Sequence, residues 1–142
     1  MTRPRLLLAV VVALAGLAWL VARLVVTDAE AARAVLTTAA DDANRGDWDA
    51  VTAAFDEDFR EAGRDRTAYV AWVKGVWRTA SVRAIALDVL DVRVEGDQAA
   101  ARVEVRLSPS AFKVTGRVDL ERRGDTWRIV RAQPDHPSYF GR

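Results

Sequence analysis

The chain has 142 residues, with 21 basic side chains, 20 acidic side chains and no cysteine. Three basic residues and no acidic ones lie before residue 28, so the remaining 115 residues carry 18 basic against 20 acidic side chains, a net charge of −2. A charge so close to zero gives no electrostatic footprint for nucleic acid. The lack of cysteine excludes disulfides and cysteine-ligated zinc. A stretch of this length suits one small domain.

The N-terminus carries an apolar run from Leu6 to Val26 in leucine, valine and alanine. As a helix this run is roughly 30 Å long, the thickness of a bilayer's hydrocarbon core. Arg3 and Arg5 precede it, and positive charge tends to stay on the cytoplasmic side. We expect residues 1–27 to form a cytoplasmic stub and a single-pass anchor that contacts the lipid bilayer through residues 6–26. A cleaved signal peptide is the alternative, although the length of the run favours an anchor.

Helical patterns follow the apolar run. Thr27 to Glu30 has the spacing of a capping box, which predicts that a new helix begins where the membrane segment stops. Gly46 and Asp47 then suit a helix end and the start of the next helix. The apolar positions of the three predicted helices have helical spacing and are Ala32, Val35, Leu36, Ala39, Ala40 and Ala43; Trp48, Val51, Phe55 and Phe59; and Tyr69, Val70, Trp72, Val73, Val76 and Trp77.

The apolar period changes to two after Ser81, which predicts strands. The alternation of Ile85, Leu87 and Val89 changes phase at Leu90, and such a change inside one strand indicates a β-bulge. Turn residues at 95–98 and 123–126 and a loop at 108–110 separate four predicted strands. The expected fold is therefore α+β, with the N-terminal transmembrane helix followed by three helices packed on a curved antiparallel sheet of about four strands.

Two short runs carry a resemblance to a known superfamily. Gly46-Asp47-Trp48 between the first two helices and the closing run from Gly124 to Val130 resemble the NTF2-like (SnoaL-like, cystatin-like cone) superfamily. The resemblance implies a cone-shaped NTF2-like domain over residues 28–133, with residues 134–142 as a C-terminal tail. Some members are isomerases or dehydratases, and many are not enzymes. The anchored form is also similar to periplasmic domains of type IV secretion proteins and to Mce-associated proteins, and no motif selects between them.

Aromatic residues are the candidate ligand site. Because a cone tends to leave a cavity, they are expected either to line a pocket or, as is commoner for aromatic residues at helical spacing, to fill the core. Trp72 and Trp127 are expected to be buried between helix and sheet. The candidate pocket residues are Phe55, Phe59, Tyr69, Trp72, Trp77 and Trp127.

The sequence contains no catalytic signature. Asp88 and Asp91 flank the predicted bulge, and Tyr69 is the best partner for either, but spacing does not show that they meet. His136 is the only histidine and lies in the tail, where we expect a solvated side chain. We therefore predict no catalytic residue, no metal and no cofactor. The expected function is a non-catalytic binding or assembly module of the cell envelope, with an envelope protein, a small hydrophobic ligand or a second copy as partner. The alternative is a small-molecule isomerase or dehydratase.

Overall fold

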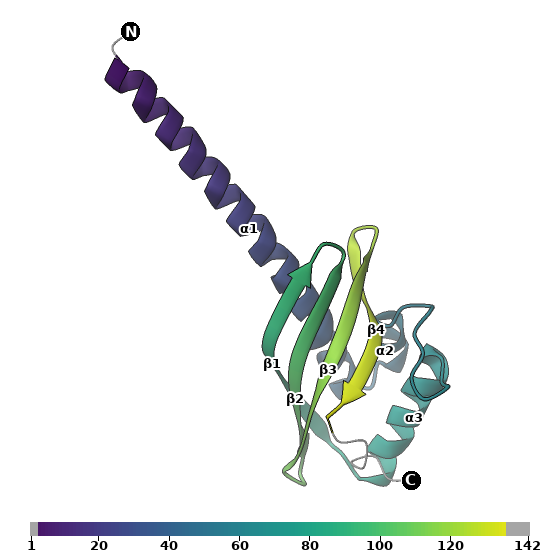
Figure 1. The fold of residues 1–142 in the computed structure, drawn as a ribbon. Helices are drawn as coiled ribbons and strands as arrows, with labels where there is room; N and C mark the ends of the chain where they lie inside the picture. The colour runs from purple at the N-terminus through teal and green to yellow at the C-terminus, as the bar shows by residue number, and fades with distance from the viewer. Residues whose placement is uncertain (1–2, 136–142) are drawn as a thin grey trace.

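A computed structural model describes residues 3–135 of the chain. Among the described residues the fold has three helices and four strands (Figure 1). Their bounds are α1 Arg3–Asn44, α2 Trp48–Ala53, α3 Arg66–Thr79, β1 Ala84–Glu95, β2 Gln98–Ser108, β3 Phe112–Arg123 and β4 Thr126–Pro134.

Helix α1 is a single helix of 42 residues, so the prediction of a new helix beginning near Thr27 is wrong. After Pro4 the segment contains no proline and only one glycine, Gly16, so nothing interrupts the i to i−4 hydrogen bonds where the capping-box spacing occurs. Its N-terminal half projects away from the rest of the fold (Figure 1), and the side chains from Leu6 to Val21 are exposed. Residues Arg3–Val21 are long and apolar enough to cross a membrane.

The C-terminal half of α1 packs against the sheet, as predicted from its alanine-rich face. Ala32, Leu36, Ala40 and Ala43 are buried, and the small side chains of the three alanines let the helix lie close to β1. The amide of Asn44 bonds both backbone groups of Ile85: it accepts from the N–H at 2.8 Å and donates to the carbonyl at 3.0 Å. Together these contacts cover the outer edge of β1, which protects part of an otherwise unpaired strand.

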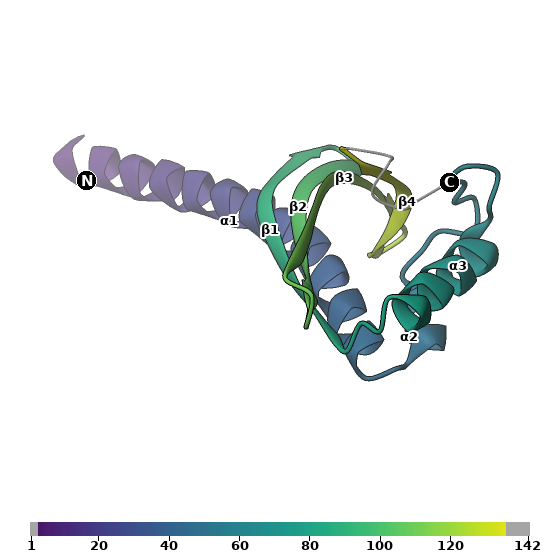
Figure 2. The ribbon, with the colours of Figure 1, turned by 90° about the horizontal axis from the view of Figure 1, so that it is seen from below.

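The sheet is antiparallel, in the order β1-β2-β3-β4, and it curls around the C-terminal half of α1 (Figure 2). The predicted bulge is present between Val89 and Asp91. Leu90 is the extra residue of this bulge and is 58% exposed. Its expected place on the apolar face is therefore wrong, because the extra residue of a bulge has no partner on the neighbouring strand and can point away from the core. A second irregularity, between β3 and β4 at Asp119/Leu120, was not predicted.

The second predicted helix is shorter than its apolar pattern. Helix α2 ends at Ala53, and Phe55 instead forms an isolated parallel bridge with Ile129 of β4. The Ile129 N–H donates to the Ala54 carbonyl at 2.9 Å, and the Asp56 N–H donates to the Ile129 carbonyl at 2.8 Å. The helical stripe that ended at Phe59 is therefore wrong beyond Ala53, since the open edge of β4 supplies backbone partners that compete with another helical turn.

The hydrophobic core lies between α1, the inner face of the sheet and the segment that joins α2 to α3. Phe59 and Leu120 are its largest fully buried side chains. The predicted helix boundary is confirmed: Gly46 has a φ of +74°, and the Asp47 carboxylate accepts from the Ala50 N–H at the start of α2. This arrangement places the apolar face of α3 toward the core and leaves the other face of the sheet to charged side chains.

Candidate functional site

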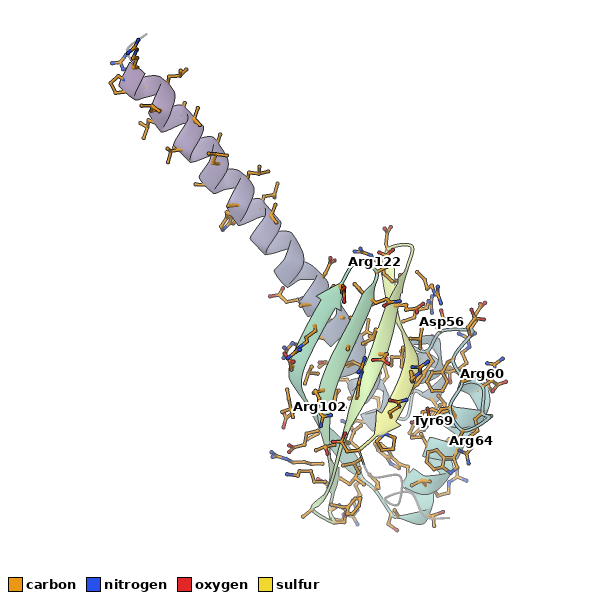
Figure 3. The ribbon with its side chains drawn as sticks, viewed as in Figure 1. Asp56, Arg60, Arg64, Tyr69, Arg102 and Arg122 are labelled. Carbon is orange, nitrogen blue, oxygen red and sulfur yellow. The ribbon has the colours of Figure 1, made fainter. Side chains whose placement is uncertain are left out.

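Four of the predicted pocket residues form a continuous chain of aromatic rings. The centroids of Phe55 and Phe59 are 4.8 Å apart with nearly perpendicular planes, those of Phe59 and Tyr69 are 5.0 Å apart, and those of Tyr69 and Trp72 are 5.8 Å apart. Edge and tilted contacts of this kind are the favourable ones between aromatic rings. This ring chain begins inside the core at Phe55 and Phe59 and ends on α3 at Trp72. Figure 3 shows Tyr69 beside Arg64.

The six predicted pocket residues differ in how deeply they are buried. Phe55, Phe59 and Trp127 are at most 8% exposed and fill the core, so the burial predicted for Trp127 is confirmed. Trp72 is only half-buried, and its predicted burial between helix and sheet is wrong. The Arg64 guanidinium lies 4.7 Å from the centroid of the Trp72 ring, so this ring packs beneath a cation of the α2–α3 segment.

Trp77 is separate from the other predicted residues. Its ring meets that of Trp48 edge to face, with the centroids 5.4 Å apart. Both rings are half-buried and both line a hollow of about 400 Å³ near the ends of α1 and α3. The structure therefore distributes the six predicted residues over the ring chain, the core under β4 and this hollow. Whether any of them binds a ligand stays a prediction.

Tyr69 is the only ionisable member of the ring chain. Burial raises the pKa of its phenol to about 12, and the negative charge of Glu61 adds to this rise while Arg64 opposes it. The phenol is therefore protonated at neutral pH. In that state Tyr69 donates hydrogen bonds or offers an apolar ring, but it is not a general base.

The two carboxylates considered for acid–base chemistry lie on the outer face of the sheet. Asp88 lies 3.7 Å from a guanidinium nitrogen of Arg106, and Asp91 accepts from Arg93 at 3.2 Å. Both are more than half exposed, while Tyr69 packs on the inner side against Phe55 and Phe59. The structure does not bring either aspartate to Tyr69.

A buried carboxylate that was not predicted is Asp56, which is 5% exposed. Burial raises its pKa, but hydrogen bonds from the Asp58 N–H and the Arg123 side chain and the charges of Arg123 and Arg128 outweigh burial and hold this pKa below its ordinary value. The Asp56 carboxylate accepts from the Asp58 N–H at 3.0 Å and from Arg123 Nε at 3.2 Å. Asp56 thereby joins the α2–α3 segment to the β3–β4 hairpin, which is a structural role.

Arg122 joins three elements where α1 leaves the domain. Its guanidinium donates to Asp28 of α1 at 3.1 Å and to Asp97 of the β1–β2 turn at 2.8 Å, and it lies 5.3 Å from the Trp127 ring centroid. The hydrogen bond to Asp97 raises the pKa of Arg122. Figure 3 shows Arg122 at the end of the sheet that carries the β1–β2 and β3–β4 turns, on the side from which the exposed half of α1 projects.

Comparison with known proteins supplies the fold assignment. No family model and no curated protein matches the sequence. Among solved structures, a variant of Rd1NTF2_05 with 16% identity matches with a TM-score of 0.62, over 72% of this chain and 95% of that one. The protein therefore has an NTF2-like fold. An NTF2-like protein of unknown function from Shewanella baltica matches at 17% identity and a TM-score of 0.57, over 80% of this chain and 97% of its own.

A further solved structure similar to this chain is a putative polyketide cyclase from Sinorhizobium meliloti. Its identity is 22% and its TM-score 0.51, with 71% of this chain and 93% of the other covered. At such identities the likeness shows a shared fold and leaves chemistry to the site itself. Within residues 3–135 no group of three or more His, Asp or Glu side chains is placed to hold a metal ion. His136 lies outside the described residues.

Proposed function

We propose that this protein is a single-pass membrane-anchored binding or assembly module, with its NTF2-like domain on the extracytoplasmic side of the cytoplasmic membrane. The observation that carries the proposal is helix α1, whose exposed apolar half runs without a break into the half that packs on the sheet. Exposed leucine and valine side chains over 19 residues match a lipid environment and not water.

The orientation of the anchor follows from its charges. Arg3 and Arg5 precede the apolar span, and basic residues next to a span favour the cytoplasmic side. The domain would then lie outside the cytoplasm. Alkaline phosphatase fused after Arg142 should be active, because this enzyme folds only after export. Activity of a cytoplasmic reporter alone at the same position would contradict the orientation, and a soluble chain beginning near Glu30 would instead indicate a cleaved signal peptide.

A non-catalytic role is part of the proposal. The ring chain holds one ionisable group, the protonated phenol of Tyr69, whereas acid–base catalysis needs a second placed group. Asp88 and Asp91 lie on the other face of the sheet and pair with arginines. A screen against substrates of NTF2-like isomerases and dehydratases should show no turnover. Turnover that is lost on Tyr69→Phe would favour the enzyme alternative.

A further inference from the structure

The hollow beside Trp48 and Trp77 differs from two other hollows of the structure, which are lined by carboxylates as well as arginines. It lies where the ends of α1 and α3 and the start of β1 meet, and its volume is about 400 Å³. We call it the distal groove. No aspartate or glutamate lines it among the described residues, and its charged and aromatic side chains are Arg45, Trp48, Lys74, Trp77, Arg78 and Arg83.

The cations of the distal groove have few internal partners. Arg45 pairs with Asp42, but within residues 3–135 Lys74, Arg78 and Arg83 form no ion pair. The arginines of β1, β2 and β3 behave differently, since each of them pairs with a carboxylate: Arg93, Arg102, Arg106, Arg117, Arg122 and Arg123. Uncompensated positive charge that gathers in one hollow attracts an anionic partner.

The two tryptophans give the distal groove an apolar wall. The centroids of their rings are 5.4 Å apart, and both residues pack against the hydrophobic core. Both residues are partly buried, and the part of each ring that stays exposed lines the groove. Flat aromatic surfaces beside arginine and lysine suit a partner that has both a ring and a negative charge.

The position of the distal groove narrows the choice of partner. The docked half of α1, residues 28–44, spans about 25 Å at 1.5 Å per residue. The groove is lined by residues at the C-terminal end of α1, and Figure 1 shows this end far from the projecting half of the helix. On the proposed topology, on which this step rests, headgroups of the anchoring bilayer lie at the other end of the domain. The partner is therefore a molecule from the space beyond the membrane.

We propose that the distal groove binds an anionic glycan, a sugar chain that carries phosphate, sulfate or carboxylate groups. The sugar rings contact Trp48 and Trp77. The acidic groups contact Lys74 and Arg78, which lie one turn apart on α3, and Arg83 from the start of β1.

The test uses the full chain in a nonionic detergent and fluorescently labelled heparin as the anionic glycan. Heparin should bind, and binding should weaken as salt rises because ion contacts are displaced. The double substitution Lys74→Gln/Arg78→Gln should weaken binding roughly tenfold or more, as expected for the loss of two charge contacts. The matched control Arg93→Gln/Arg106→Gln removes the same charge from the outer sheet face and should change binding by less than about twofold. No binding, or an equal loss in both double variants, would overturn the proposal.

Three further probes test the sugar and the source of the negative charge. Neutral dextran should not bind, polyphosphate should bind more weakly than heparin, and Trp77→Phe should weaken heparin binding while leaving polyphosphate binding unchanged. Stronger binding to phosphatidylglycerol vesicles than to heparin would overturn the glycan proposal in favour of a membrane surface. These outcomes do not depend on the phosphatase fusion, so failure of the proposed topology would be recognised separately.

Discussion

At the residue scale, burial of the aromatic side chains decides which of them stabilise the fold. Phe59 is completely buried and touches Phe55 and Tyr69, whereas Trp72 lies half-buried under Arg64. The sequence pattern assigns both to apolar helix faces and so does not distinguish them. The difference comes from the α2–α3 segment, whose path places Phe59 in the core and Arg64 over Trp72.

We expect Phe59→Ala to lower the free energy of unfolding by about 3–5 kcal/mol, the usual range for removing a buried phenyl ring from a packed core. Trp72→Ala should cost less, about 1–2 kcal/mol, because its ring is only partly buried and lies outside the hydrophobic core. Denaturant titration of the full chain in nonionic detergent measures both values. Equal losses for the two variants would show that the Trp72 ring is as deeply packed as Phe59.

Asp56 gives the fold a pH dependence of known sign. Its folded pKa lies below the ordinary value of 3.8, so its stabilising contribution is fully present above that value and is lost as the pH falls toward the folded pKa. Asp56→Asn should lower stability at neutral pH by roughly 1–3 kcal/mol and flatten the loss of stability below pH 4. Unfolding curves between pH 2 and 7, with exposed Asp88→Asn as control, measure this. An unchanged acid profile in Asp56→Asn would contradict the assigned role.

At the element scale, the strands are well predicted because alternation of apolar residues directly reports a half-buried sheet. The β1 bulge shows as a phase change within one strand. The β3–β4 irregularity leaves no such mark, and neither does the bridge of Phe55 to Ile129, since backbone groups carry it. Gly116 is another case: a Cβ atom there would lie 2.7 Å from the Gln133 carbonyl oxygen, a closeness that no local pattern shows.

Asn44 is the only asparagine in the chain, and its role also depends on contact between distant segments. Asn44→Ala removes both bonds to Ile85 and should cost about 1–2 kcal/mol, together with faster hydrogen exchange at the Ile85 amide. Asn44→Asp keeps the acceptor and should retain protection of that amide better than alanine does. Exposed Thr38→Ala on α1 serves as the control. Unchanged exchange at Ile85 in Asn44→Ala would rule out this edge contact.

At the scale of the whole molecule, the main finding of the structure is that the exposed apolar span and the part packed on the sheet belong to one helix. From composition alone, the membrane-spanning segment is expected to end near residue 27. This boundary stays a prediction. The lack of proline after Pro4 and the unbroken helical spacing from Leu6 to Ala43 were the available signal for continuity. The Arg122 contacts to Asp28 and Asp97 then hold the helix to the hairpin end, which fixes the direction in which the domain faces.

The distal groove was beyond prediction from sequence. Arg45, Lys74 and Arg83 belong to three separate segments, and each alone reads as an ordinary solvated cation. Only the packing of α3 beside the end of α1 gathers them around Trp48 and Trp77. If the proposed anchoring and binding hold, the helix at one end of the domain and the cationic groove at the other would keep a partner at a set distance from the membrane.

The continuity of α1 in a bilayer is the central claim, and a distance measurement between two spin labels tests it most directly. The chain has no cysteine, so Leu14→Cys in the exposed half and Thr38→Cys in the docked half can be labelled specifically. In liposomes, an unbroken helix predicts a backbone separation of about 36 Å for 24 residues. Its distance distribution should be as narrow as that of a reference pair at Leu6 and Val21. A broad distribution, or a markedly shorter distance, would show a hinge between anchor and domain and would contradict the account.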